Sequence, residues 1–290
     1  MSNAALIAIV GPTAAGKSAV AMSIAHRVGA EIVNGDAFCL YRGMDIGTAK
    51  PSGADRAAIA HHVIDTHDVS AEVDVATYQH LARTAVREVL GRGVPVVLAG
   101  GSGLYVQAAL DDLQFPATDR TVRARLEQEL ADVGSRALHA RLAAVDPVAA
   151  GEIQPANGRR IVRALEVNEL TGQPFTASLG QPTAWLPSLR IGFDPGVAAV
   201  DSAIEARVHL MWQQGLVDEV QRLGPHMSRT ARLAVGYRQI LEDPQTARER
   251  TITATRQLAR KQRKWFRRDP RVRWAQTPAQ VDQILGTLEV

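Results

Sequence analysis

The first third of the chain alternates between short apolar runs and segments with helical periodicity. Strands are predicted at 5–10, 31–33 and 94–99, with a further possible strand at 61–65. Apolar positions at helical spacing follow the first of these runs as far as Val28 and recur at 76–90. Strands that alternate with helices predict a parallel α/β sheet with helices on both faces.

The pattern changes near Pro116. From about 119 to 180 only helical patterns occur, and the apolar run 189–193 then predicts another core strand. The expected helices are 121–133, 135–145 and 159–171, followed by two more near 201–223 and 246–268. We therefore expect an all-helical insertion domain at 118–187. The α/β core, with its helical C-terminal region, is expected to comprise 1–117 and 188–290.

Composition narrows the class of protein. The 290 residues are 46% hydrophobic and 22% charged, as in an ordinary soluble globular protein. No apolar run approaches the roughly 18 residues that span a bilayer, so no membrane association is expected. The only cysteine, Cys39, excludes an internal disulfide and any multi-cysteine metal site. The cytoplasm is the expected compartment.

Positive charge is concentrated near the C-terminus. Net charge is +3, but between Arg256 and Arg273 nine Lys or Arg residues face a single acid, Asp269. Such a run can be a solvated helix face. Here Trp265 and Phe266 lie among the charges, and that mixture suits a polyanion such as nucleic acid.

The segment "GPTAAGKS", Gly11–Ser18, matches the phosphate-binding P-loop pattern and lies between a predicted strand and a predicted helix. Loop N–H groups and the helix N-terminus would hold an anionic phosphate. Lys17 would add a point charge, and the Ser18 hydroxyl could bind Mg²⁺. The motif indicates a diphosphate or triphosphate ligand.

Other features limit the chemistry. A motor ATPase usually places an acid after a long apolar strand, whereas "VPVVLAGG" ends in glycines. Kinases and other diphosphate chemistries remain open. Ser102 in "GGSGL" lacks the spacing of a nucleophile elbow and is interpreted as a hydrogen-bonding group. His61 and His62 lack a third ligand at metal spacing and are interpreted as structural.

Several stretches together resemble the tRNA dimethylallyltransferase (tRNA adenine-37 isopentenyltransferase) family. They run in the family's order and cover most of the chain: "GPTAAGKS", "YRGMDIGTAKP", "HHVID", "GGSGLY", "RRIVRALEV", "GLVDEV", "GYRQI" and "TRQLARKQRKWF". The "MDIGTAKP" block is far more specific than the P-loop.

The resemblance implies a P-loop NTPase-like core and a prenyl transfer. In this family the P-loop holds the diphosphate of dimethylallyl diphosphate, and N6 of adenosine 37, next to the anticodon, attacks the allylic carbon. Mg²⁺ is the implied cofactor, and the anticodon stem-loop of tRNA is the implied partner. Such a target base would be extruded from its stack. We expect a monomer.

The resemblance also implies roles for individual residues. The catalytic set is Asp36 as proton acceptor, with Ser102 and Lys17. The diphosphate-binding set is Gly11, Pro12, Thr13, Ala14, Ala15, Gly16, Lys17 and Ser18, with Ser18 as the metal ligand. The tRNA-binding set is Asp36, Ala37, Phe38, Cys39, Ser102, Arg123, Arg159, Arg160, Ile161, Val162, Arg163, Arg256, Lys261 and Lys264. For the arginines near 160, a salt-bridge face with Glu166 and Glu169 is the alternative.

The chain departs from the family pattern at three places. Ala37-Phe38-Cys39 stands where Ser-x-Gln is usual, Ser102 replaces a common threonine, and Gly158 replaces a more usual acid. Glutamine can read an adenine edge with both a donor and an acceptor, which cysteine cannot do. Alternative functions are a P-loop small-molecule kinase or ATPase, and an inactive RNA-binding relative. An adenylate isopentenyltransferase is a further possibility, although the insertion and the basic helix favour RNA.

Overall fold

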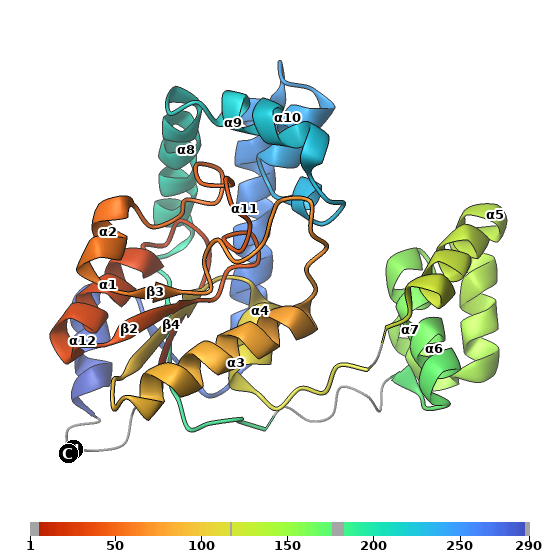
Figure 1. Ribbon diagram of the computed structural model, residues 1–290, viewed down its shortest axis with the longest axis horizontal. Coiled ribbons are helices and arrows are strands. Elements are labelled where there is room, and N and C mark those ends of the chain that lie inside the picture. The colour runs from red at the N-terminus through yellow and green to blue at the C-terminus, as the bar shows by residue number, and fades with distance from the viewer. Residues whose placement is uncertain (1–5, 117, 176–182, 288–290) are drawn as a thin grey trace. The chain divides into compact units, whose positions relative to one another are not determined.

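The structure is a computed structural model that describes residues 6–116, 118–175 and 183–287 (Figure 1). The chain divides into two compact units. The first comprises residues 1–110 with 184–290, and the second comprises residues 111–183. These limits fall earlier in the chain than 118 and 187, the limits expected from the sequence.

Parallel strands form one sheet in the first unit, and the order among its described residues is β3-β2-β4-β1-β5-β6. β1 lies at the centre, in register with β4 (Leu6 beside Val96) and with β5 (Ile7 beside Leu189). The strands are β1 (Leu6–Val10), β2 (Glu31–Asn34), β3 (His61–His62), β4 (Val96–Gly100), β5 (Leu189–Phe193) and β6 (Val272–Ala275). The predicted parallel sheet is confirmed.

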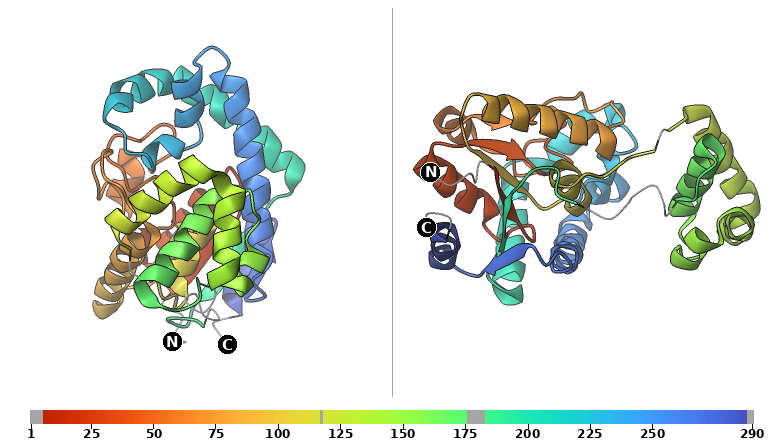
Figure 2. Two further views of the ribbon diagram at one scale, coloured as in Figure 1. Left: turned by 90° about the vertical axis from the view of Figure 1, so that its right-hand side faces the viewer. Right: turned by 90° about the horizontal axis from the view of Figure 1, so that it is seen from below.

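Helices cover both faces of this sheet because its central strands are apolar on both sides. Ala8 and Leu98 pack toward α3 (Val75–Gly91) and α4 (Gly103–Leu110). On the other face Ile9 packs with helices α1 (Lys17–Val28), α8 (Val197–Gln213) and α12 (Pro278–Gly286). The right-hand view of Figure 2 shows the sheet between these two layers.

The remaining elements of the first unit lie beyond the carboxyl ends of the strands or beside α8 (Figure 1). Helix α11 packs along α8. Its Ile252 belongs to the apolar core on the α1 side of the sheet, and its Phe266 belongs to the core on the α3 side. These elements are α2 (Gly53–Ala58), α9 (Leu216–Leu223), α10 (Tyr237–Glu242) and α11 (Ala247–Phe266), with 3₁₀ turns at Gly224–His226 and Ala231–Leu233. Within the described ranges no helix has the length and apolarity needed to cross a membrane.

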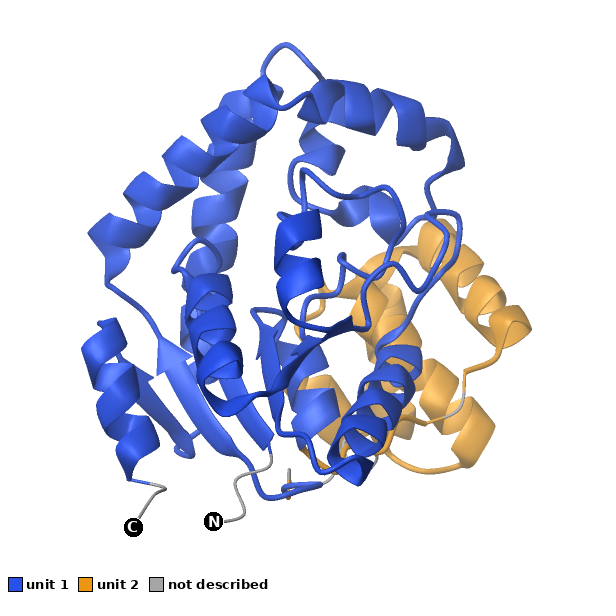
Figure 3. Cartoon of the chain, turned by 60° about the vertical axis from the view of Figure 1, so that its left-hand side comes forward, with its two compact units in different colours: residues 1–110, 184–290 blue, residues 111–183 orange. Residues whose placement is uncertain are grey.

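The second unit is helical in its described residues, and Figure 3 shows it in orange. It contains α5 (Arg120–Val145), α6 (Pro147–Glu152) and α7 (Gly158–Thr171). Leu138 and Leu142 of α5 pack with Ile161 and Leu165 of α7 in a separate apolar core. Gly134, with φ of 80°, interrupts α5 at the break expected between 133 and 135.

One prediction from periodicity is wrong, and another is confirmed only in part. The single helix expected at 201–223 is two helices, because Gly215 adopts a left-handed conformation between α8 and α9. The strand expected at 61–65 ends at His62, since Val63 (φ 62°) and Asp65 (φ 54°) leave the extended region.

Candidate active site

The P-loop connects β1 to α1 at the centre of the sheet. Gly11 has φ of 140°, and a Cβ there would lie 2.4 Å from the Phe193 carbonyl oxygen of β5. Gly16 is the N-cap residue of α1, and no side chain among the described residues caps this helix start. The first N–H groups of α1 and its positive end therefore remain available to an anion.

Two distant residues contact Thr13 in this loop. The Arg207 guanidinium of α8 donates from Nη2 to Thr13 Oγ1 at 2.7 Å. The Thr13 backbone N–H donates to Gln262 Oε1 of α11, also at 2.7 Å. Sequence reasoning assigned a role to neither residue, because 194 and 249 positions separate them from Thr13.

Lys17 lies in an electropositive environment. Its ammonium donates to the Pro12 carbonyl oxygen at 2.6 Å, and its pKa is lowered from 10.5 to about 8. Burial is the main cause and the Arg207 charge the second, while the carboxylates of Asp36 and Asp194 act in the opposite direction. A bound anion would offset the repulsion between the two cations.

Asp36 follows β2, and its carboxylate is held from one side. Oδ1 accepts the Phe38 N–H at 2.9 Å, while Oδ2 lies 3.5 Å from Ser102 Oγ. The Ser102 hydroxyl oxygen also accepts the Ala37 N–H at 3.2 Å, which ties the β2 loop to the β4 loop. The Asn34 side chain accepts the Asp36 N–H at 2.9 Å and so fixes the turn. Both carboxylate oxygens thus have a partner, and the contact of Oδ2 with Ser102 is the longer of the two.

The loops after β2 and β4 approach each other with no room for a side chain. A Cβ on Gly100 would lie 2.2 Å from the Gly35 carbonyl oxygen. This close approach gives a steric reason for β4 to end in glycine, and it places Ser102 beside Asp36.

Cys39 is buried in the loop after β2, three residues beyond Asp36. Its Sγ lies 3.9 Å from the Thr48 carbonyl oxygen. Burial and the neighbouring Asp36 charge raise the pKa of the thiol far above its ordinary value. The thiol is therefore protonated at neutral pH and unsuited to nucleophilic chemistry.

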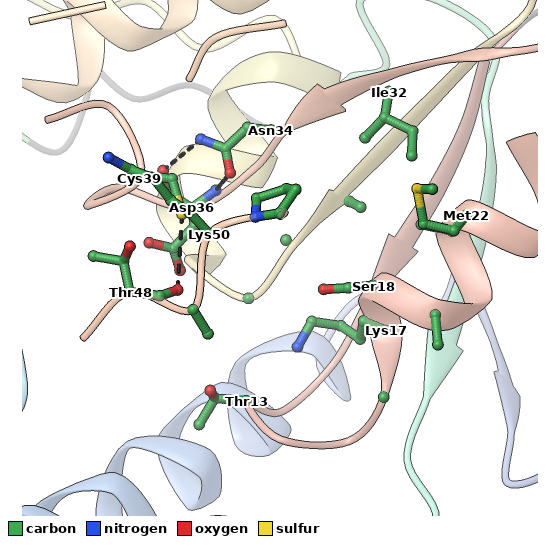
Figure 4. Close-up of a pocket in the computed structure, with 18 of the residues that line it drawn as sticks. Thr13, Lys17, Ser18, Met22, Ile32, Asn34, Asp36, Cys39, Thr48 and Lys50 are labelled. Atoms are coloured by element: carbon green, nitrogen blue, oxygen red, sulfur yellow. Dashed lines mark hydrogen bonds between the residues drawn. The ribbon is translucent and has the colours of Figure 1, made fainter. Parts of the chain in front are cut away.

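These groups line one cavity of about 790 Å³ (Figure 4). Thr13, Lys17 and Ser18 come from the P-loop and α1, and Asp36 and Cys39 come from the loop after β2. Arg207 and Gln262 also line it. Because all the strands are parallel, their carboxyl ends meet at one edge, which is where such sheets hold ligands.

The "MDIGTAKP" block supports the cavity rather than supplying many reactive groups. Lys50, whose side chain is 2% exposed, donates to the Tyr41 carbonyl oxygen and to the carboxylates of Asp45 and Asp65. The buried Glu219 carboxylate of α9 accepts hydrogen bonds from the backbone N–H groups of Asp45, Ile46 and Gly47. It also accepts a hydrogen bond from the Tyr237 hydroxyl. The motifs "GLVDEV" and "GYRQI" therefore meet this block through one carboxylate.

The basic face expected on α11 contains paired and unpaired charges. Arg256 pairs with Glu205 of α8 at 2.8 Å, and Arg263 forms two bonds with the buried Asp194 at 2.5 and 2.8 Å. Lys261 and Lys264 are exposed. These two lysines are therefore the α11 charges best placed to meet a polyanion.

The helical unit distributes its predicted RNA-binding residues differently. Arg159 and Arg160 are exposed at the start of α7, whereas Ile161 and Val162 lie in the apolar core. The side chains of Ile161 and Val162 are therefore covered within the helical unit.

Two arginines of the predicted tRNA-binding set face a buried carboxylate in this unit. Arg123 and Arg163 pair with Glu166 at 2.6 and 2.8 Å, and the Glu166 side chain is fully covered. Of the arginines near 160, only Arg163 therefore forms an ion pair expected from the salt-bridge alternative. The ion pairs of Glu169 involve Arg125 and Arg141 instead.

The described residues contain no group of three or more acidic, His or Cys side chains able to hold a metal ion. His61 Nδ1 contacts the Ile59 carbonyl oxygen just before β3, and His62 Nε2 contacts the Glu31 carboxylate of the neighbouring strand β2. Ser18 is exposed at the cavity wall beside Lys17. A hydroxyl in that position fits Mg²⁺ only if a phosphate ligand supplies further oxygens.

Known proteins share the sequence and the fold. Residues 39–269 match the model of a family described as IPP transferase. A tRNA dimethylallyltransferase of Kineococcus radiotolerans is 52% identical over 298 aligned positions, covering 97% of this chain and 94% of that protein. The solved tRNA isopentenylpyrophosphate transferase of Bacillus halodurans is 33% identical with a TM-score of 0.69, covering 98% and 96% of the two chains. A eukaryotic dimethylallyltransferase solved acting on tRNA shares the fold, with a TM-score of 0.75 at 24% identity over 90% of this chain and 69% of that one.

The parallel sheet with a P-loop after its central strand defines an α/β protein of the P-loop class. The family match and the 52% identity to a relative of nearly equal extent narrow this class. The chain belongs to the IPP transferase family, and the family expected from its motifs is confirmed.

Proposed function

We propose that this chain transfers a dimethylallyl group from dimethylallyl diphosphate to N6 of adenosine 37 in tRNA and releases diphosphate. The observation that carries the proposal is that a cationic anion-binding site and a carboxylate line the same cavity. Lys17, Arg207 and the start of α1 line the cavity together with Asp36. Relatives named tRNA dimethylallyltransferase support the choice of substrates.

Asp36 is proposed as the proton acceptor. The adenine amine is a weak nucleophile, because its lone pair is delocalised into the ring, and it needs a partner for the proton that it loses. As the N6–C1 bond forms and the C1–oxygen bond breaks, the N6 proton passes to Asp36 Oδ2. The bond from the Phe38 N–H holds the other carboxylate oxygen and fixes the orientation.

Lys17 and Arg207 are proposed to stabilise the leaving diphosphate. Their charges lie where negative charge grows as the C1–oxygen bond breaks. Arg207 lines the cavity, and its bond from Nη2 to Thr13 Oγ1 holds the guanidinium at the P-loop. Ser18 would be the protein ligand of Mg²⁺, which when bound would supply further charge stabilisation to the diphosphate.

The tRNA is proposed to contact exposed cations on both units. Lys261 and Lys264 of α11, and Arg159 and Arg160 of α7, are available to phosphates without breaking a described ion pair. The adenine must leave its stack to reach Asp36. The proposed location of the protein is the cytoplasm.

The rival P-loop functions are separated by the products that form. Purified protein is incubated with Mg²⁺ and either ATP alone or unmodified tRNA with dimethylallyl diphosphate. We expect isopentenyladenosine in the tRNA digest and no phosphate release from ATP. Phosphate release from ATP without prenylated tRNA would favour a kinase or ATPase. Binding of tRNA with neither product would favour an inactive relative.

A further inference from the structure

Helix α11 packs directly on the backbone of the loop that follows β4. A Cβ on Gly101 would lie 2.8 Å from Gln262 Nε2, and a Cβ on Gly103 would lie 2.5 Å from Trp265 Cδ1. Gln262 and Trp265 are three residues apart, so neighbouring positions on one side of the helix meet this loop. Gln262 lines the cavity, and Trp265 is not among the described residues that line it. The indole therefore lies at the edge of the cavity.

A three-residue loop connects this indole to the proposed proton acceptor. Ser102 stands between the two glycines, and its Oγ lies 3.5 Å from Asp36 Oδ2. The next residue, Gly103, lies against the indole, with Cγ, Cδ1 and Nε1 of Trp265 all within 2.7 Å of the position that a Cβ would occupy. A group that contacts the indole would thus be close to the place where the carboxylate acts.

The indole is only partly covered, and cations lie beside it. Trp265 is 40% exposed. Lys261 lies one helical turn earlier on the same face, Lys264 directly precedes the indole, and both lysines are exposed. Proteins bind single-stranded nucleic acid with this combination, in which bases stack on aromatic rings and cations follow the phosphates. The chemistry of this surface therefore fits an unpaired nucleotide.

We propose that Trp265 is a positioning residue that stacks on an unpaired base of the anticodon loop, next to the adenosine that enters the cavity. The proposal rests on the proposed transfer to tRNA and deepens it. An adenosine that leaves its stack deprives the adjacent base of a stacking partner. The indole replaces that partner at the edge of the cavity, while Lys261 and Lys264 meet nearby phosphates. The stack holds the RNA in register with Asp36.

The test measures binding of tRNA to the full chain by fluorescence anisotropy. Three unmodified tRNAs are compared: one intact, one without the base on the 5′ side of the target adenosine, and one without the base on its 3′ side. For wild type, removal of one of these two bases should weaken binding about tenfold, the effect of one lost base–aromatic stack.

Two variants separate stacking from packing. Trp265→Leu keeps an apolar contact with Gly103 but has no aromatic face, so the same base removal should weaken its binding by about twofold or less. Trp265→Phe keeps an aromatic face and should retain a loss of about fivefold. As a control, Trp185→Leu removes the half-buried indole that packs between Arg83 and Arg87 of α3, and it should show the full wild-type loss.

The outcomes decide the proposal separately from the transferase function, because binding requires no prenyl transfer. Wild-type protein that tolerates both base removals would overturn the proposal, even if it prenylates intact tRNA. So would an undiminished loss in Trp265→Leu, or a Trp265→Phe variant that behaves like the leucine variant. Thermal unfolding near the wild-type temperature establishes that the variants are folded.

Discussion

Arg207 Nη2 donates to Thr13 Oγ1 at 2.7 Å, which brings a guanidinium from α8 to the tip of the P-loop. The same guanidinium lowers the pKa of Lys17, together with burial. Two cations are therefore held close together in a covered site. Bringing like charges together costs free energy that a bound diphosphate recovers, so the free protein is prepared for an anionic ligand.

The first prediction concerns pH. The pKa of Lys17 is lowered to about 8, so the cation that attracts the donor is present below that pH and is lost above it. We expect kcat/KM for dimethylallyl diphosphate to fall as the pH rises through about 8, since this ratio reports groups of the free enzyme. Lys17→Arg keeps its charge at every accessible pH and should remove the decline. A decline that persists in this variant would assign it to another group.

Asp36 provides the second prediction. Asp36→Asn keeps the size of the side chain and the acceptor for the Phe38 N–H, but it cannot take a proton. We expect kcat to fall by roughly 10²- to 10⁴-fold while the Kd for tRNA changes little. Single-turnover assays and filter binding measure the two quantities. Undiminished turnover would remove Asp36 from the mechanism.

Glu219 gives a stability prediction. Its buried carboxylate accepts from the backbone of residues 45–47 and from the Tyr237 hydroxyl. Glu219→Gln replaces one acceptor with a donor that faces other donors, so the free energy of unfolding should fall by about 2 kcal/mol. The exposed neighbour Asp218 serves as the control, and Asp218→Asn should change it by less than about 0.5 kcal/mol. Equal effects in the two variants, measured by urea denaturation, would contradict this role.

The exposed lysines of α11 give a prediction about salt. Lys261→Ala and Lys264→Ala should each reduce the slope of log K for tRNA against log salt concentration by about 0.7 to 0.9, the value for one lost phosphate contact. Arg248→Ala changes an exposed cation in the first turn of the same helix and should leave the slope unchanged. If all three variants keep the wild-type slope, the lysines do not contact the RNA.

The sequence was sufficient for the parts of the molecule that depend on local pattern. The P-loop, the strand before it and the acid after β2 are each contained within a few residues, so a motif or a periodicity identifies them. The helical spacing of Ile161, Ala164 and Leu165 could also have indicated that Ile161 faces a core. Assigning that residue to RNA followed the motif instead of the periodicity.

The rest of the site depends on packing between distant segments. Arg207 and Gln262 reach Thr13 only because α8 and α11 pack together on the sheet. On the sequence alone, Arg207 is one more charge on an amphipathic helix, and Gln262 is one polar residue within a basic run. Glu219 likewise looks like a solvated acid until the 45–47 loop folds over it.

The central claim is most directly tested by mapping the modification on one tRNA. Unmodified tRNA is incubated with the protein, Mg²⁺ and dimethylallyl diphosphate, digested to oligonucleotides and analysed by mass spectrometry, while diphosphate release is measured in parallel. We expect one dimethylallyl group on the adenosine next to the anticodon and one diphosphate released for each group transferred. Folded protein that binds the tRNA and leaves that adenosine unmodified would contradict the proposed function.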